Sequence, residues 1–211
     1  SEEKLTITGT NGQTALDVAD GNLVVADNID LEGDIDVNGT ANLDGATYVA
    51  WQWKANGGST TSATTTDGIA SATRQVDSTS KFSIIGYTSE STQAVGTIEH
   101  GLGVTPEFML IKRLPQTDNW AVYHHKNTAA PETELLALNS TASTTDIATA
   151  WNDTAPTSSV FTLGALSDVN EGSGVTYICY AWAEVQGYSK FGGYKGNGDA
   201  NGPFVYTGFK P

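Results

Sequence analysis

The feature that most constrains this chain is an internal repeat of a strand-like segment. Gly45–Trp53 reads Gly-Ala-Thr-Tyr-Val-Ala-Trp-Gln-Trp, and Gly174–Trp182 reads Gly-Val-Thr-Tyr-Ile-Cys-Tyr-Ala-Trp. Further along, Ser80–Phe82 and Ser189–Phe191 both read Ser-Lys-Phe. The first copy is the longer one between these matches, because it contains the Ser- and Thr-rich stretch Ser59–Ser80, which is typical of a surface insertion. The chain therefore contains two copies of one module.

The two copies are expected to pack together in one folded unit. The match continues at Gly86-Tyr87 and Gly193-Tyr194, and both copies are rich in aromatic and β-branched residues, which favour strands. We therefore predict that Tyr48–Trp53 lies near Tyr177–Trp182. Only the first copy continues into another strand-like run, Phe108–Leu114, so we expect the second copy to leave a free strand edge or a junction.

Composition indicates an all-β protein and excludes several classes of partner. Thr, Ser, Asn and Val are abundant, the strong helix formers are scarce, and there are 23 Gly residues. The net charge of −14 repels nucleic-acid phosphates and anionic membranes, so no nucleic-acid partner is expected. No apolar run approaches the roughly 20 residues of a membrane span, so no membrane insertion is expected. The single cysteine, Cys179, is predicted to be a core residue.

The N-terminal residues 1–45 contain a six-residue repeat that predicts a fibre stalk. Hexads begin at Leu23, Ile29, Ile35 and Ala41, with apolar residues at positions one and three and usually Gly at position five. Apolar residues two apart share one face of a short strand, and Gly provides the turn. The predicted apolar core of this stalk consists of Leu23, Val25, Ile29, Leu31, Ile35, Val37 and Leu43.

A single-chain β-helix needs about three hexads per coil and at least about three stacked coils to bury a core. The four hexads make little more than one coil, so they are too few. Three intertwined chains would cover one another's apolar faces. We therefore predict that three copies of this chain form a homotrimer with a β-helical stalk. A flexible acidic leader is the alternative.

No metal or other cofactor is predicted. Asp34–Gly39 resembles the start of an EF-hand calcium loop, but Gly45 stands where that loop needs a bidentate Glu. The polar side chains there fit the solvent face of the stalk. His124 and His125 are adjacent, so on a strand they face opposite sides and cannot bind one metal ion together. Three copies of one histidine on a trimer axis are the alternative.

Residues 46–211 are predicted to form an antiparallel β-sandwich, the head, with roughly 8–10 strands. Ser59–Ser80 is interpreted as a polar loop or a weakly paired ribbon, and Gly193–Gly202 as a hairpin loop. Glu134–Leu138 fits a strand better than a short helix. The strands are expected at Thr47–Trp53, Lys81–Tyr87, Val95–His100, Phe108–Leu114, Trp120–His125, Glu134–Leu138, Ile147–Trp151, Ser159–Leu163 and Val175–Val185.

No catalytic motif stands out, so the chain is predicted not to be an enzyme. Nucleophile elbow, P-loop, dinucleotide-binding and His-Glu-x-x-His patterns are absent from the sequence. Aromatic and amide side chains near loops suit surface recognition, because aromatic rings stack on sugars. The candidate recognition residues are Asn119, Trp120, Trp151 and Asn152. The competing interpretation places tryptophans in the core; it is favoured for Trp53 and Trp182 and stays open for Trp120 and Trp151.

Four segments of the head carry a resemblance to a known family. They are Tyr48–Ala55, His100–Lys112, Asn119–Tyr123 and Phe191–Asp199. Together they resemble an uncharacterised β domain of tail fibre and other appendage proteins of marine bacteriophages, over about residues 46–211. The leader resembles the stalk repeats of phage fibres. The family's known biochemistry provides no active-site residues to transfer.

The resemblance implies a virion protein located in a tail fibre or another external appendage. Its N-terminal end would contact other virion proteins, and its head would attach to a host cell-surface glycan or protein. One alternative is a capsid-bound fibre or decoration protein with a purely structural role. A weaker alternative is a spike that degrades glycans.

Overall fold

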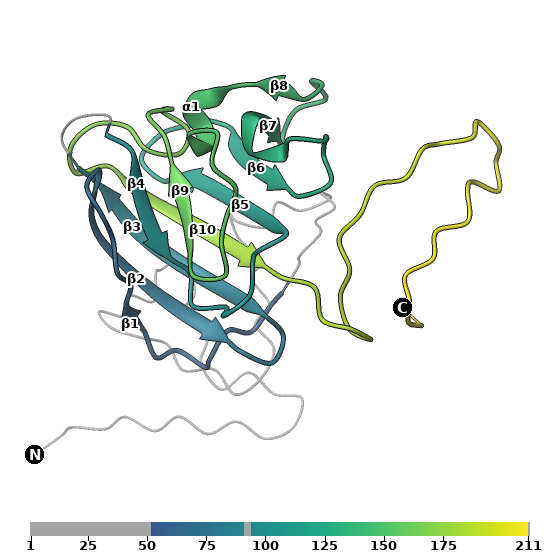
Figure 1. The fold of residues 1–211 in the computed structure, drawn as a ribbon, viewed down its shortest axis with the longest axis horizontal. Coiled ribbons are helices and arrows are strands. Elements are labelled where there is room, and N and C mark those ends of the chain that lie inside the picture. The colour runs from purple at the N-terminus through teal and green to yellow at the C-terminus, as the bar shows by residue number, and fades with distance from the viewer. Residues whose placement is uncertain (1–51, 91–93, 211) are drawn as a thin grey trace, which may run out of the picture. The chain divides into compact units, whose positions relative to one another are not determined.

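The computed structural model describes residues 52–90 and 94–210, and these form an antiparallel all-β fold (Figure 1). The predicted stalk, including its core from Leu23 to Leu43, and the predicted strand residues 47–51 lie outside the described residues. One sheet has eight strands in the order β1-β2-β3-β10-β5-β6-β7-β8, and a second has two, β4 and β9. All-β, sandwich-like character is therefore confirmed for the head.

The strands are short and the helical content is small. The strands are β1 (Thr61–Ser62), β2 (Ile69–Asp77), β3 (Phe82–Ser89), β4 (Gly96–Glu99), β5 (Phe108–Arg113), β6 (Trp120–His124), β7 (Glu134–Ala137), β8 (Thr145–Asp146), β9 (Val160–Leu163) and β10 (Thr176–Trp182). A 3-10 turn, η1 (Pro131–Thr133), precedes β7, and the one-turn helix α1 (Ala148–Trp151) follows β8.

Strand β10, from the second copy of the repeat, lies at the centre of the large sheet. It pairs with β3 along Thr176–Trp182 and with β5 along Tyr177–Trp182. Tyr177, Cys179 and Ala181 are buried in the main core, whereas Tyr180 and Trp182 point to the other face. This is the alternation that a strand imposes on its side chains, and it confirms Cys179 as a core residue.

The small sheet covers one face of the large sheet. β4 and β9 pair with each other and cross in front of β3 and β10 in Figure 1. Ile98 of β4 and Phe161 and Leu163 of β9 are almost completely buried and belong to the same core cluster as Ile85 of β3. Burying each such side chain contributes about 1.5–3 kcal/mol, so the contact between the two sheets stabilises the fold.

The opposite face of the large sheet, hereafter the outer face, has a smaller cluster of its own. It contains Ala55, Phe82 and Trp182, with Phe108 and Tyr180 packed against them. The outer face is thus apolar, although neither β4 nor β9 covers it.

The stretch Ser59–Ser80 differs from the predicted loop, because it contains β1 and the nine-residue strand β2. β2 pairs with β3 along nearly its whole length. The stretch is therefore also paired more extensively than the weakly paired ribbon, the alternative prediction. The register shifts between Ile69 and Ser71, and this bulge interrupts the alternation of apolar side chains. The interrupted alternation makes β2 hard to recognise in the sequence.

The predicted strand Ile147–Trp151 is wrong. Only Thr145–Asp146 before it is a strand, and Ala148–Trp151 forms α1. Ala is the best helix former, and two of the four residues of α1 are Ala. The helix ends at Asn152, whose φ of 55° places it in the left-handed region that Asn tolerates. The strand predicted at Glu134–Leu138 is confirmed as β7.

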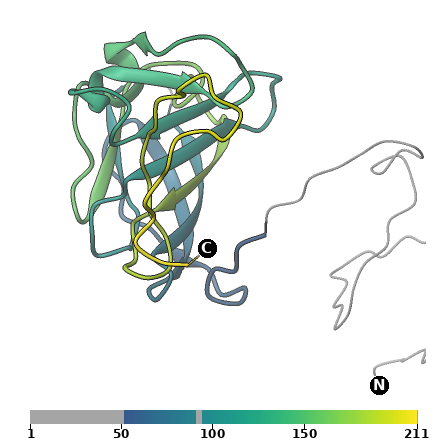
Figure 2. The same ribbon diagram turned by 90° about the vertical axis from the view of Figure 1, so that its right-hand side faces the viewer.

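After β10 the chain forms an irregular C-terminal arm, residues 183–210. Figures 1 and 2 together show it as a long loop that stands out from the body and turns back toward its own start. Val185 and Ser189 form an isolated bridge, and the amide of Gly202 donates to the carbonyl of Asp199 in a turn. No strands flank that turn, so the predicted hairpin at Gly193–Gly202 is wrong.

Trp53 and Trp182, equivalent residues of the two copies, lie against each other, while residues 48–51 of the predicted contact lie outside the described residues. Their ring centroids are 5.3 Å apart in an edge-on arrangement. Trp182 is 7% exposed, which confirms it as a core residue, whereas Trp53 is 49% exposed. The expectation of a core position is therefore wrong for Trp53, because the indole rests on the outer face with its other side open.

Candidate functional site

The four predicted recognition residues lie in two separate places. Asn119 and Trp120 are at the start of β6, and the Asn119 side-chain oxygen accepts a hydrogen bond from Asn139 at 3.1 Å. Trp151 and Asn152 are at the end of α1. Trp120 belongs to the outer face and Trp151 to the main core, so the four do not form one site.

Trp151 is 1% exposed and cannot act as a surface recognition residue. Its Nε1–H donates to the Glu134 carbonyl at 2.8 Å, and its ring meets Tyr123 edge-on at 5.7 Å between centroids. Of the two interpretations that the sequence left open for Trp151, the core position is correct, because the one-turn helix directs this indole inward. Asn152 is exposed, but its left-handed backbone has a structural role in ending α1.

Trp120 is half-buried and joins a row of aromatic rings on the outer face. Its ring centroid lies 6.4 Å from that of Tyr180, and Tyr180 lies 6.2 Å from Trp182. Trp182 in turn stacks on Phe82 at 4.9 Å and lies 5.5 Å from Phe108. A role of Trp120 in recognition stays a prediction, and this row of rings is the surface on which it would act.

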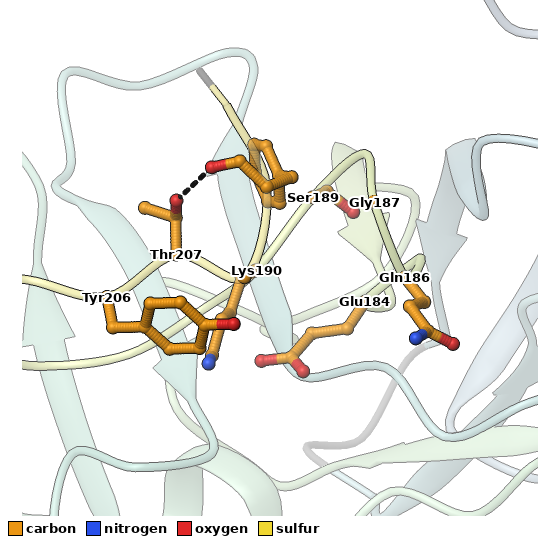
Figure 3. A pocket seen from close by; sticks show the side chains of 9 residues that line it. Glu184, Gln186, Gly187, Ser189, Lys190, Tyr206 and Thr207 are labelled. Carbon is orange, nitrogen blue, oxygen red and sulfur yellow. Dashed lines mark hydrogen bonds between the residues drawn. The ribbon is translucent and has the colours of Figure 1, made fainter.

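Two stretches of the arm border a half-open pocket of about 280 Å³, hereafter the arm pocket (Figure 3). It forms where the end of the arm returns beside the start of the arm, which Figure 2 shows. The lining residues are Glu184, Gln186, Gly187, Ser189, Lys190, Tyr206, Thr207, Gly208 and Phe209.

Hydrogen bonds and charges hold the polar groups of the arm pocket in place. The Glu184 carboxylate accepts a hydrogen bond from the Phe191 amide at 2.9 Å, and the Lys126 ammonium is 3.7 Å away. The Lys190 ammonium lies 5.5 Å from the Tyr206 ring centroid, within the range of a cation–π contact. Figure 3 shows the Glu184 carboxylate, the Lys190 ammonium and the Tyr206 ring close together on one side of the pocket.

This arrangement can bind a polyhydroxylated ligand. The Tyr206 ring is largely exposed and offers an apolar face with a hydroxyl at its end. Glu184 can accept hydrogen bonds from ligand hydroxyls, and the Gln186 amide can both donate and accept. The lining glycines, Gly187 and Gly208, have open space where a Cβ would stand, so no side chain of theirs narrows the pocket.

The described residues offer few groups for chemistry. Within 52–90 and 94–210, no group of three or more His, Cys, Asp or Glu side chains is placed to hold a metal ion. Burial raises the pKa of the Cys179 thiol well above its ordinary value, which keeps the thiol protonated and unreactive. Over the same part of the chain, no helix has the length and apolar character of a membrane span.

Sequence reasoning missed the arm pocket. Its residues come from two short stretches, Glu184–Lys190 and Tyr206–Phe209, and only the path of the arm brings them together. The one available signal was Phe204-Val-Tyr206, a cluster of large apolar residues within a Gly-rich segment. Exposed apolar patches can mark binding sites.

Comparison with known proteins places the chain in a family. Neither a curated protein nor a solved structure matches it. The family model described as "Domain of unknown function (DUF7483)" matches residues 3–211, which include both the hexads and the head. The chain therefore belongs to the family of the domain of unknown function DUF7483.

Proposed function

We propose that this chain is an external appendage protein of a bacteriophage virion, a tail fibre or spike whose head attaches to a glycan on the host surface. The phage-appendage resemblance of its motifs and the hexads of residues 1–45 support the location. The all-β head supports a rigid, exposed recognition domain.

The arm pocket is the observation that carries the recognition role. It combines an exposed aromatic ring with a carboxylate, an amide and hydroxyls, the groups that fit the apolar face and the hydroxyls of a sugar. At about 280 Å³ the pocket is near the lower limit of small-molecule sites, about 300 Å³. We therefore expect it to hold one sugar unit of a longer chain.

The preferred sugar is neutral. The chain carries a net charge of −14, and such a field lowers the local concentration of acidic polysaccharides. Neutral hexoses or hexosamines avoid this repulsion and still satisfy Glu184 and Gln186.

Binding without cleavage is the role that the pocket favours. Glycoside hydrolysis usually requires two carboxyl groups, separated by about 5–9.5 Å, on either side of the scissile bond. Glu184 is the one acidic residue among those that line the arm pocket. This composition argues against the glycan-degrading spike.

The test is binding of the purified full chain to cells of the phage's host and to their extracted surface polysaccharide. We expect Tyr206→Ala to weaken binding about tenfold, in the range of an interface hot spot. The matched control is Phe204→Ala, since Phe204 is 90% exposed on the same arm but does not line the pocket.

The remaining outcomes separate the alternatives. Loss of binding in Trp120→Ala with no effect of Tyr206→Ala would move the site to the outer face. No binding by the unaltered chain would support the purely structural fibre or decoration protein. Release of oligosaccharides from the polysaccharide would support the glycan-degrading spike.

A further inference from the structure

A glycine stands on the outer face at a position where the fold does not require one. Gly86 lies inside β3 and shares the outer face with Ile84 and Thr88, since Ile85 and Tyr87 between them belong to the main core. A glycine inside a strand weakens the strand, and it often marks a bulge, a closely approaching backbone or the approach of a ligand. The role of Gly86 therefore depends on which of these three applies.

The structure removes the first two explanations for Gly86. The register of β3 is continuous at this residue, which pairs with Thr73 of β2 and with Ile178 of β10. A Cβ on Gly86 would meet nothing closer than the Thr73 hydroxyl, at 3.8 Å. Neither a bulge nor a crowding backbone requires glycine here, so the open space beside Gly86 is the feature that the glycine provides.

That space is a half-open pocket of about 270 Å³, hereafter the glycine hollow. Four residues with side-chain hydroxyls border it, Ser71 and Thr73 from β2, Thr88 from β3 and Thr176 from β10. Ser71, Thr73 and Thr176 are exposed, so their hydroxyls are accessible to a ligand. Each of these hydroxyls can both donate and accept a hydrogen bond.

Leu114 adds an apolar side to the glycine hollow. It is 56% exposed, and its amide donates to the Thr176 carbonyl at 3.0 Å, which holds the residue beside β10. Among the described residues that line the hollow, none is charged. Neutral hydroxyls next to an apolar side chain match the hydroxyls and the C–H groups of an uncharged sugar.

We propose that the glycine hollow is a second sugar-binding subsite, which takes another neutral sugar unit of the glycan that binds at the arm pocket. The choice of a sugar as the ligand rests on the proposed function. The volumes of the two pockets, about 270 and 280 Å³, are nearly equal, so the hollow also holds one sugar unit.

The outer face connects the two pockets. β10 extends over about 20 Å from Thr176 to Trp182, at about 3.3 Å per residue, and Glu184 of the arm pocket follows two residues later. Tyr180 and Trp182 lie on the outer face between the pockets. A polysaccharide long enough to cover this distance occupies both subsites at once, and the second contact then raises the overall affinity.

Nuclear magnetic resonance with monosaccharides locates the bound sugar directly. The probes are glucose, galactose, mannose and N-acetylglucosamine, each titrated separately into the deuterated full chain. A sugar in the glycine hollow shifts the amide signals of Thr73, Thr88 and Thr176, whereas a sugar in the arm pocket shifts those of Gln186 and Gly187. The two subsites are thus observed independently in one experiment.

Gly86→Val fills the hollow with a side chain that strands favour. We expect it to weaken sugar binding at the hollow about tenfold, because the new side chain occupies the place of the ligand. Thr73→Val removes one hydroxyl and nearly keeps the shape, and should weaken binding about twofold to tenfold. Thr61→Val in β1, exposed on the same sheet but outside the hollow, is the matched control and should leave binding unchanged.

The outcomes separate this proposal from the proposed function. Amide shifts confined to the arm pocket, or binding at the hollow that Gly86→Val and Thr73→Val leave unchanged, would overturn the second subsite and leave the arm pocket standing. Shifts confined to the hollow that both variants weaken would support the subsite and count against the arm pocket. No shift with any of these sugars would overturn a neutral-sugar site in the hollow.

Discussion

At the scale of single residues, the two tryptophans with the most different surroundings are Trp151 and Trp53. Trp151 is buried and hydrogen-bonded, whereas Trp53 rests half-exposed on the outer face. Trp151→Ala would leave a large cavity and an unpaired Glu134 carbonyl, so we expect the free energy of unfolding to fall by about 3–5 kcal/mol. Denaturant titration of the full chain measures this loss.

Trp53→Ala is the matched control, with an expected loss of about 1 kcal/mol or less, because half of the indole is already in water. Equal losses in the two variants would contradict the assigned burial of Trp151.

His100 makes stability depend on pH. The Leu102 amide donates to its Nδ1 at 3.2 Å, so its Nε2 carries the proton and donates to the Thr157 carbonyl, also at 3.2 Å. Burial lowers the pKa of His100, with smaller effects from the Thr157 hydrogen bond and the nearby Arg74 and Glu99. Below about pH 6.5 the unfolded chain binds a proton that the folded chain resists, so stability falls as the pH drops from 7 toward 5.

His100→Gln keeps a donor and an acceptor at this position but cannot titrate. We expect it to flatten the dependence of the free energy of unfolding on pH between 7 and 5. His124→Gln should change this dependence less, because burial lowers the pKa of the half-exposed His124 in the same direction but covers less of its ring. A pH dependence unchanged by His100→Gln would count against the buried, neutral histidine.

Residue environments could be predicted only in part from the sequence. Alternation in β10 correctly placed Cys179 in the core. It did not separate Trp53 from Trp182, because periodicity shows which side chains share a face and not how completely each is covered. The inward direction of Trp151 depends on one turn of helix, which leaves too short a pattern to detect.

At the scale of elements, strong apolar runs were reliable and interrupted ones were not. β5 and β10 were predicted nearly to their ends, since both are nearly continuous apolar runs of the kind found in central strands. β2 was missed because a bulge breaks its pattern, and α1 was missed because four residues carry no helical period.

The junction between α1 and β9 depends on Gly164. Its amide donates to the Ala150 carbonyl at 2.9 Å, and a Cβ on Gly164 would collide with the carbonyl of Thr149. We expect Gly164→Ala to lower the free energy of unfolding by about 1–3 kcal/mol, because backbone atoms must move to relieve this collision. Thermal unfolding monitored by circular dichroism measures the effect.

Gly86 in β3 provides the control. A Cβ there meets nothing closer than the Thr73 hydroxyl at 3.8 Å, so Gly86→Ala should be neutral or stabilising by up to about 1 kcal/mol. A Gly164→Ala variant as stable as Gly86→Ala would contradict the close approach of α1 to β9.

At the scale of the whole molecule, the site was the hardest part to predict. The arm pocket unites residues from both ends of an irregular arm, and no periodic pattern fixes the path of such a segment. The surface residues chosen from the sequence, Asn119 and Trp120, lie instead beside the outer face. The local sequence identifies aromatic residues that can bind a ligand. Only the fold determines which polar groups lie next to them.

The hexads predict the assembly of the whole chain. Ile29→Asp with Ile35→Asp places charges in the predicted apolar core of the stalk, where burial without a partner is costly. We expect the unaltered chain to be a trimer and this double variant to lose the trimer, as measured by light scattering after size exclusion. An unaltered chain at 22.1 kDa, the mass of one copy, would contradict the intertwined stalk.

We propose that this chain is the part of a virion that touches the host. The most direct measurement is electron microscopy of phage particles bound to host cells and labelled with an antibody against the purified chain. We expect label on an external appendage, at the contact between particle and cell envelope. Label spread over the capsid away from that contact, or absent from the particles, would contradict a role in host attachment.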